Sequence, residues 1–395
     1  MIPRARLDAV TEADLAALID HGVRESRTLD YKRDWPTDRD ARIEIAKDVC
    51  AFANSLGGDL VFGVDDGKTG VAIGFAPVTV DNLDGELLVL TSFLRDTLEP
   101  RVTGGLHAHP VPLAAGGHVV ILRVSPSPSA PHRVTKDNHF YARTSVGKEP
   151  MDIHGIRNAF AASASLGNSI RNFCDDALTR LERRLTPALD KDEALCVCHV
   201  VPVSAFSRHE THDIDSLVVA GELLRDACSA NLLAPQINLD GVACRPHRND
   251  TSRDGVQLYR NGAVELAYSE LLGRSPLDDQ KGGRSIFPEE YEIPLVRRGL
   301  IALAQAFGSL DVNPPAYLML SWLVGSEARV AVTRSQYRAD FIRLPENAGR
   351  ISAPPIYLED FGADPLTVLR PAFDVLWNAV GVAHTRTDFA AADPD

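Results

Sequence analysis

Three motifs near the start of the chain decide the fold: Glu25-Ser-Arg-Thr-Leu-Asp30-Tyr-Lys32, Ala51-Phe-Ala-Asn54-Ser-Leu-Gly57-Gly58-Asp-Leu-Val-Phe-Gly63-Val-Asp-Asp66 and Gly70-Val-Ala-Ile-Gly74. Residues 28–32 suit a strand, in which the side chains of Asp30 and Lys32 point to one face. Glu25 lies at an odd spacing from Asp30, so a straight strand would separate the two carboxylates. We therefore expect Glu25 to reach Asp30 from a preceding turn or helix end.

The stretch between the first two motifs predicts an amphipathic helix over residues 40–55. Its apolar arc faces a core, and Gly57 and Gly58 end it. The polar arc carries three charged residues, Glu44, Lys47 and Asp48. A capping-box-like pair, Thr11 with Asp14, predicts a short helix before the first motif.

The glycine pair leads into a strand over residues 60–64, whose continuous apolar run indicates burial on both faces. Asp65-Asp66-Gly67 then predicts a hairpin turn into a second strand at 71–75. The remaining elements expected before residue 185 are a helix at 83–98, strands at 106–111, 118–124 and 139–145, and a long helix from 151.

Length and composition favour a mixed α/β (α+β) protein of more than one domain. The chain has 395 residues, of which 45% are apolar. We expect a first domain at residues 1–165, a helical linker at 166–190, a second α/β domain at 191–385 and a tail at 386–395. The first residues lack the apolar core of a signal peptide and no apolar run is long enough to span a bilayer, so we expect a cytoplasmic protein without membrane contact.

The second half predicts further strands and helices but little chemistry. Its clearest signal is a hairpin around Asn261-Gly262, flanked by strands. Pro294 is expected in the first turn of a helix that runs to Phe307. The other expected elements are strands at 195–201 and 316–323 and helices at 216–230 and 366–379.

The net charge of −13 argues against a general nucleic-acid-binding surface, but one window is basic. Residues 101–160 hold seven basic and three acidic side chains, a balance of +4. Any polyanion should bind there, unless these are ordinary solvated surface charges. The candidate nucleic-acid-binding residues are Arg123, Arg133, Lys136, Arg143 and Lys148.

The motifs place carboxylates at element ends, where they would suit a hard divalent cation such as Mg²⁺ or Mn²⁺. The candidate metal ligands are Glu25, Asp30 and Asp66, with Asp65 as a competitor for the third place. Lys32 would stabilise negative charge on phosphoryl oxygens, which makes these four residues the candidate catalytic set. The structural alternative is a plain hairpin turn at Asp65-Asp66-Gly67 and a surface ion pair between Asp30 and Lys32.

Taken in order, the three motifs resemble the Schlafen-type AlbA-like domain, whose bacterial members are often labelled divergent AAA or ATP-binding proteins. The strand around Phe140-Tyr-Ala-Arg143 and the helix after Pro150 are similar to the closing elements of that domain, so the resemblance covers about residues 12 to 160. In the Schlafen ribonucleases three acidic residues of these motifs bind the metal, and they fall here on Glu25, Asp30 and Asp66. The second of these is usually glutamate, so the shorter Asp30 would have to approach the metal more closely.

The resemblance implies a metal-dependent endoribonuclease that acts on structured RNA, above all transfer RNA, in stress or anti-phage defence. It also implies a homodimer, because animal Schlafens pair two AlbA-like lobes and this chain has one. The rival expectation is a non-catalytic regulator that binds nucleic acid or a nucleotide with the same fold. A short segment, Tyr259-Arg260-Asn261-Gly262 with Glu265, weakly resembles other bacterial proteins of this kind, and we expect a regulatory or sensing role for the second domain.

Two other sites are disfavoured. Gly63-Val-Asp-Asp-Gly67-Lys68-Thr69 is one residue short of a phosphate-binding loop, and its aspartates would repel phosphate. Cys196-Val-Cys198-His199 lacks a second pair at zinc-ribbon spacing, which favours a buried strand. The six cysteines need not form disulfides in a chain of this size.

Overall fold

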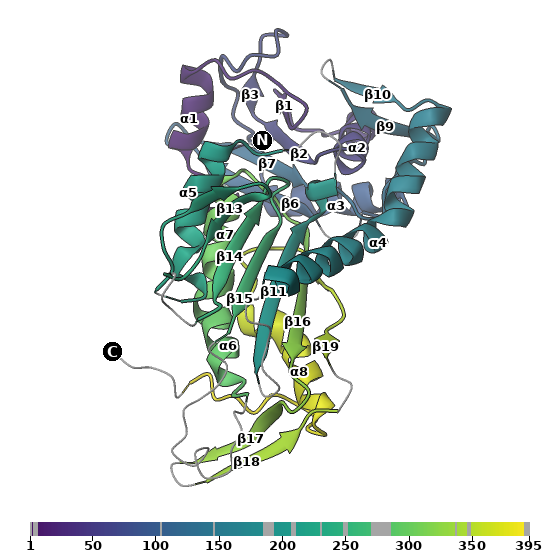
Figure 1. The fold of residues 1–395 in the computed structure, drawn as a ribbon. Helices are drawn as coiled ribbons and strands as arrows, with labels where there is room; N and C mark the ends of the chain where they lie inside the picture. The colour runs from purple at the N-terminus through teal and green to yellow at the C-terminus, as the bar shows by residue number, and fades with distance from the viewer. Residues whose placement is uncertain are drawn as a thin grey trace. The chain divides into compact units, whose positions relative to one another are not determined.

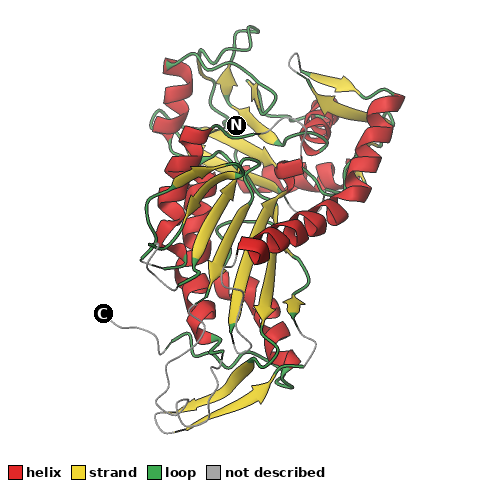
Figure 2. Cartoon of the chain, viewed as in Figure 1, coloured by secondary structure: helices red, strands yellow, loops and turns green. Residues whose placement is uncertain are grey.

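The computed structural model describes residues 2, 7–102, 105–144, 147–184, 193–206, 211–229, 231–247, 252–269, 286–335, 338–345 and 349–390. Helices and strands are mixed in several sheets, which confirms the α/β class (Figures 1 and 2). The chain divides into two compact units: unit 1 is Met1–Asn168 with Asn313–Pro315, and unit 2 is Ser169–Val312 with Ala316–Asp395.

The main sheet of unit 1 has the strand order β1-β2-β7-β6. Its bounds are β1 Leu29–Lys32, β2 Gly58–Phe62, β7 His118–Val124 and β6 Leu106–Pro112. β1 runs parallel to β2, and the other neighbours are antiparallel. The strands expected at 28–32, 60–64, 106–111 and 118–124 are therefore present, although β2 starts two residues earlier and ends before Gly63.

A second sheet of unit 1 has the order β10-β9-β8-β5 and supplies basic residues to the site described below. Its bounds are β10 Lys148–Pro150, β9 His139–Arg143, β8 Arg133–Val134 and β5 Leu98–Glu99. The expected hairpin is present in shorter form: β3 (Val64–Asp65) pairs with β4 (Gly74–Phe75), whereas Val71 of the strand expected at 71–75 bridges Arg24 instead. The helices before residue 100 are α1 Glu12–Asp20, α2 Arg39–Ala53 and α3 Leu83–Thr97.

Local sequence explains why α1 and α2 begin and end where they do. α1 starts with the expected capping box between Thr11 and Asp14. The Asp38 carboxylate accepts a hydrogen bond from the Ala41 amide at 2.8 Å, which caps α2. After α2, a Cβ on Gly57 would lie 2.6 Å from the carbonyl oxygen of Val124, and its φ is +76°. Gly58 has the Phe52 ring where its Cβ would be, so glycine at that position lets α2 pack against β2, whereas Gly57 makes room for Val124 and Pro126 at the end of β7.

Unit 2 is built on an eight-stranded sheet with the order β12-β13-β14-β15-β11-β16-β19, in which β20 also pairs with β16. The strand bounds are β11 Ala194–Pro202, β12 Gln236–Asn238, β13 Gly241–Cys244, β14 Gly255–Tyr259, β15 Val264–Tyr268, β16 Ala316–Val324, β19 Arg350–Ser352 and β20 Ile356–Leu358. A separate hairpin joins β17 (Arg329–Ser335) to β18 (Arg338–Arg343). The expected hairpin around Asn261-Gly262 is β14–β15.

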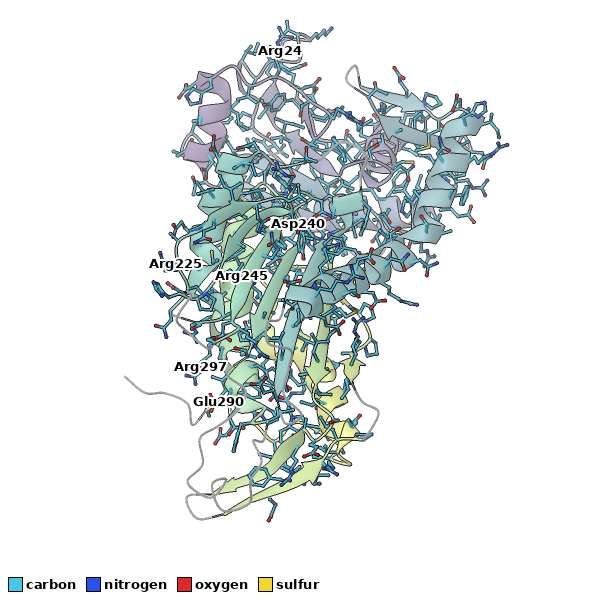
Figure 3. All side chains as sticks on the ribbon, in the orientation of Figure 1. Arg24, Arg225, Asp240, Arg245, Glu290 and Arg297 are labelled. Carbon is cyan, nitrogen blue, oxygen red and sulfur yellow. The ribbon has the colours of Figure 1, made fainter. Side chains whose placement is uncertain are left out.

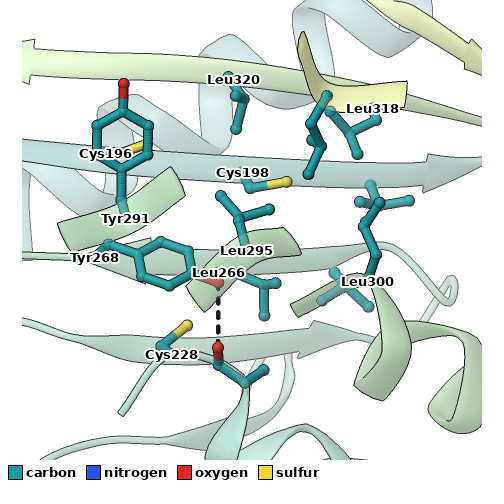
Figure 4. Packing of buried hydrophobic residues seen from close by; sticks show 14 of the residues in the cluster. Cys196, Cys198, Cys228, Leu266, Tyr268, Tyr291, Leu295, Leu300, Leu318 and Leu320 are labelled. Carbon is teal, nitrogen blue, oxygen red and sulfur yellow. Dashed lines mark hydrogen bonds between the residues drawn. The ribbon is translucent and has the colours of Figure 1, made fainter. Parts of the chain in front are cut away.

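Helices cover this sheet and enclose the largest core of the protein. They are α5 Ile214–Leu224, α6 Glu289–Pro294, α7 Leu300–Ser309 and α8 Pro365–Ala379, with a π-helical stretch at Leu295–Gly299. Figure 4 shows Cys196, Cys198 and Cys228 packed with Tyr268 and Tyr291 in this core. All six cysteines are buried and unpaired, and burial raises the pKa of the Cys198 thiol well above its ordinary value. These thiols are core residues, as the spacing indicated.

Several expectations for the second half need correction. The helix expected from Pro294 starts earlier, at Glu289, and Pro294 lies inside the helical stretch, where its missing amide is accommodated at the change from α- to π-helix. Strands β12, β13 and β17 to β20 were not expected, because their short runs carry no clear alternation. Part of the expected tail is packed: the ring of Phe389 stacks on Phe373 with centroids 6.2 Å apart. Residues 391–395 lie outside the described part.

The long helix α4 (Ile153–Arg184) crosses the division between the units at Asn168. Its second half packs on the unit 2 sheet through Leu178 and Leu181, which contact Leu195 and Val197. The expected helical linker at 166–190 is therefore helical as far as the structure describes it. Among the described residues, we find no helix that combines the length and apolar character needed to cross a membrane.

Candidate functional site

Asp30 and Lys32 of the first motif lie in a buried group of charges that also includes Asp48, Arg143 and Lys148, which we call the ion cluster. Asp30 Oδ1 lies 2.6 Å from Lys32 Nζ, and Asp30 Oδ2 accepts a hydrogen bond from Arg143 Nη1 at 2.6 Å. The expectation that Asp30 and Lys32 share a strand face is consistent with this pair. Asp30 is only 5% exposed, so the alternative of a surface ion pair is wrong.

Asp48 is the member that sequence analysis missed. It was placed on the solvent-facing arc of α2, yet it is 1% exposed and lies 3.2 Å from Lys32 Nζ and 3.1 Å from Lys148 Nζ. α2 is buried almost all round from Ile45 to Ala53 because it packs between both sheets of unit 1. The signal was the unbroken apolar run 49–53, which leaves no solvent-facing arc for a charge at position 48.

Arg143 is the central cation of the ion cluster. Besides Asp30, its guanidinium lies 3.6 Å from Asp48, donates a hydrogen bond to the carbonyl oxygen of Ser26 at 3.2 Å and sits 4.6 Å from the Phe52 ring centroid. The fork of a guanidinium can contact two carboxylates at once, which an ammonium group does less well. Arg143 therefore links β9 to β1 and α2 and is not a surface base.

The charges of the ion cluster compensate one another. Burial alone would lower the pKa of Lys32, but the neighbouring Asp48 and Asp30 carboxylates outweigh it, so its pKa is raised. Lys148 also lies 3.1 Å from a carboxylate oxygen of Glu44 on the more exposed side. Glu44 is shared with Lys47, whose Nζ lies 2.7 Å from its other carboxylate oxygen.

Glu25 reaches this region from the turn before β1, as expected. Its Oε1 accepts a hydrogen bond from the Tyr31 amide at 2.9 Å, and its own amide donates to the carbonyl oxygen of Gly70 at 2.7 Å. Burial raises the pKa of Glu25; the Tyr31 amide and Lys32 oppose this, while the negative charges of Asp30 and Asp66 add to it. The three candidate carboxylates therefore interact electrostatically.

The two candidates for the third position have different surroundings. Asp65 forms an ion pair with Arg33 and accepts a hydrogen bond from the Gly67 amide. Asp66 accepts hydrogen bonds from the amides of Lys68 and Gly70, both at 3.2 Å. Both aspartates therefore shape the hairpin turn, which is the structural role we considered. Asp66 is the one whose charge acts on Glu25.

We next asked whether these carboxylates fit a metal ion. In the part of the chain that the structure describes, no three side chains of histidine, cysteine, aspartate or glutamate are grouped so that they could hold one. Asp30 is bound by two cations, Asp66 by its own turn and Glu25 by a backbone amide. As the side chains stand, Glu25, Asp30 and Asp66 do not form a ready metal centre.

The bases expected to bind nucleic acid are mostly engaged within the protein. Arg123 is 3% exposed and makes two hydrogen bonds to Asp59, at 2.8 and 3.0 Å, so it cannot serve as a surface contact. Its place on the central strand β7 explains this, since both faces of that strand are covered. Arg133 pairs with Glu99 at 2.5 Å, whereas Lys136 is exposed. Arg143 and Lys148 belong to the ion cluster.

Arg143→Ala should lower the free energy of unfolding by about 3–5 kcal/mol, because it removes the one fully buried cation of the ion cluster and leaves the buried Asp30 and Asp48 carboxylates to the partly solvated lysines. Lys148→Ala should cost less than about 1 kcal/mol, because its charge is partly solvated and Asp48 keeps two other cations. Urea unfolding followed by circular dichroism measures both values. Equal losses for the two variants would contradict the central role of Arg143.

Glu25→Gln should be more stable than the unchanged protein at pH 7 in EDTA. The fold raises the pKa of Glu25, so the ionised side chain is disfavoured in the folded state above that pKa, while glutamine keeps the acceptor for the Tyr31 amide. The difference in melting temperature should shrink as the pH falls through the raised pKa and vanish below the ordinary value of 4.5. A difference independent of pH would show that the charge is not its cause.

Comparison with known proteins places the site within a family. Residues 25–152 match the family model described as Schlafen, AlbA_2. The N-terminal domain of a RecG-related protein from Nitrosomonas europaea is 18% identical, with 30% of this chain and 74% of that chain covered and a TM-score of 0.24. The DIP2311 protein from Corynebacterium diphtheriae is 16% identical, with 55% and 42% covered and a TM-score of 0.25.

These two structural likenesses are too weak to support any conclusion about this chain. No match to a curated protein was found. The family model covers the three motifs and the strands that carry Arg143 and Lys148. Residues 25–152 therefore match the Schlafen AlbA_2 domain, which supports a nucleic-acid-related role for this part of the chain.

Proposed function

We propose that the AlbA_2 domain is an endoribonuclease that uses Mg²⁺ or Mn²⁺, with Glu25, Asp30 and Asp66 as ligands. The observation that carries the proposal is that the half-buried Glu25 lies beside both other carboxylates. Its Oε1 accepts a hydrogen bond from the amide of Tyr31, the neighbour of Asp30, and its own amide donates to the carbonyl oxygen of Gly70, whose amide donates to the Asp66 carboxylate. Such a group of carboxylates repels itself, and a divalent cation would relieve that repulsion. When bound, the ion would polarise a phosphodiester and lower the pKa of a bound water molecule.

The proposal requires the carboxylates to change partners when the metal binds. Asp30 would lose its contact with at least one of its two cations, and the Asp66 carboxylate would lose its hydrogen bond from the Gly70 amide. Lys32 has a side chain that is 29% exposed, so it can meet the negative charge on phosphoryl oxygens from the edge of the ion cluster. The Tyr31 amide would keep Glu25 oriented.

Transfer RNA is the substrate we propose to test first, because the family resemblance implies it. Stress or anti-phage defence is the proposed setting, and unit 2 the proposed regulatory or sensing part. A second candidate function is non-catalytic binding of nucleic acid or a nucleotide. The internal charge balance around Asp30 favours it, since a carboxylate that is already neutralised has little need of a metal.

Cleavage of transfer RNA separates the two candidates. Purified protein should cut it with Mn²⁺ or Mg²⁺ and not with EDTA. Glu25→Gln and Asp66→Asn should each reduce the rate by more than about 100-fold, because even loss of a residue behind the ligands commonly costs 10- to 100-fold. Gel electrophoresis of the RNA measures the rate, and Asp65→Asn is the matched control for Asp66.

Asp30→Asn belongs to the same set but needs a folding control, because Asp30 is buried. Its melting temperature should be measured beside its cleavage rate. No cleavage with either metal, or cleavage that survives all three substitutions, would rule out the nuclease and leave the binding function. If Asp65→Asn lowers the cleavage rate and Asp66→Asn does not, Asp65 is the third ligand in place of Asp66.

We also propose that the protein is a homodimer, since a single AlbA_2 domain would then be paired with a second one to clasp RNA. Light scattering coupled to size-exclusion chromatography should give twice the chain mass of 42.9 kDa. The measurement should be made with and without transfer RNA. A monomer under both conditions would contradict the pairing.

A further inference from the structure

Two turns of unit 1 lie side by side next to Glu25 and Asp66. The amide of Glu25 donates to Gly70 O at 2.7 Å, and Arg24 pairs with Val71 in an antiparallel bridge. The amide of Ala72 completes the contact by donating to the carbonyl oxygen of Val23 at 3.3 Å. The turn before β1 and the loop between β3 and β4 are thus joined by their backbones.

The first turn presents two arginines to solvent. Ser26 and Leu29 exchange backbone hydrogen bonds, and the Thr28 amide donates to Ser26 Oγ at 3.2 Å. These hydrogen bonds close a tight turn in which Arg27 is one of the two central residues. Both Arg24 and Arg27 are exposed. Figure 3 shows Arg24 at the periphery of unit 1.

The second turn presents a lysine. Lys68 is exposed and has a φ of +62°, a left-handed conformation that L residues rarely adopt. The Asp66 carboxylate holds it there through the amides of Lys68 and Gly70. A strained residue held by its neighbours often marks a functional site. Here the strain keeps a cation at the tip of the loop.

We call Arg24, Arg27 and Lys68 the basic rim. Within the described residues, none of the three forms an ion pair, whereas Arg33 beside them is paired with Asp65 and Lys32 belongs to the ion cluster. Exposed cations without partners are the ones that gain most from meeting phosphate. In a chain with a net charge of −13, these three stand next to the carboxylates of Glu25 and Asp66.

We infer that the basic rim binds the phosphate backbone of RNA and positions it over Glu25 and Asp66. The choice of RNA rests on the proposed function. Neither turn, 24–28 or 66–70, contains an aromatic residue on which a base could stack. We therefore assign the rim to the phosphates, and its contribution to affinity should not depend on RNA sequence.

Binding of fluorescently labelled transfer RNA, measured by anisotropy in EDTA, tests the rim without cleavage. The variant is Arg24→Gln, Arg27→Gln and Lys68→Gln combined. The control combines Arg39→Gln, Arg95→Gln and Arg157→Gln, which removes the same charge from other exposed positions of unit 1. Both should keep the circular dichroism spectrum and melting temperature of the unchanged protein.

The rim variant should bind more weakly, and its plot of log Kd against log salt concentration should be shallower by about 2–3, roughly one for each lost phosphate contact. The control should keep the original slope. An equal or larger loss in the control, or no loss in either variant, would overturn the inference. So would a complete lack of RNA binding by the unchanged protein, which would also remove the proposed function. If the unchanged protein cleaves transfer RNA and the rim variant binds it with the same Kd and salt dependence, the inference about the rim is wrong and the proposed function stands.

Discussion

The contact between Arg143 and the carboxylates of Asp30 and Asp48 is the interaction on which the AlbA_2 domain depends. It joins the first strand, the helix that follows it and a strand more than a hundred residues later. Each of these charges would be expensive to bury alone, and together with Lys32, which lies 2.6 Å from Asp30 and 3.2 Å from Asp48, they are neutral. The cluster therefore fixes how both sheets of unit 1 pack on α2, and it determines which carboxylates remain for chemistry.

This dependence gives two carboxylates of the motifs, Glu25 and Asp66, two roles at once. Glu25 covers the Tyr31 amide at the free edge of β1, and Asp66 closes the loop that carries Lys68. The same side chains are the proposed metal ligands. A carboxylate that already has a structural partner must exchange it to bind a metal, so the fold and the reaction compete for the same oxygens.

Sequence reasoning was reliable where the chemistry is local. The Thr11 capping box, the glycine pair after α2 and the Asn261-Gly262 hairpin depend on residues a few positions apart, and all three are present. It was unreliable for charges whose partners are distant in the chain. Asp48, Arg123 and Arg143 look like surface residues when read in order, because their partners lie on other strands. The basic window was a real excess of positive charge, but much of it is used inside the protein.

The glycine pair at positions 57 and 58 has a consequence of a different kind. Gly57 is required because Val124 and Pro126 leave no room for a side chain, and Gly58 because the Phe52 ring occupies that space, and neither condition has anything to do with metal or RNA. The glycines that help to make the motif recognisable are therefore explained by packing and not by catalysis. Another chain could keep that signature in full after losing every catalytic group, so membership of the family and competence as an enzyme are carried by different residues.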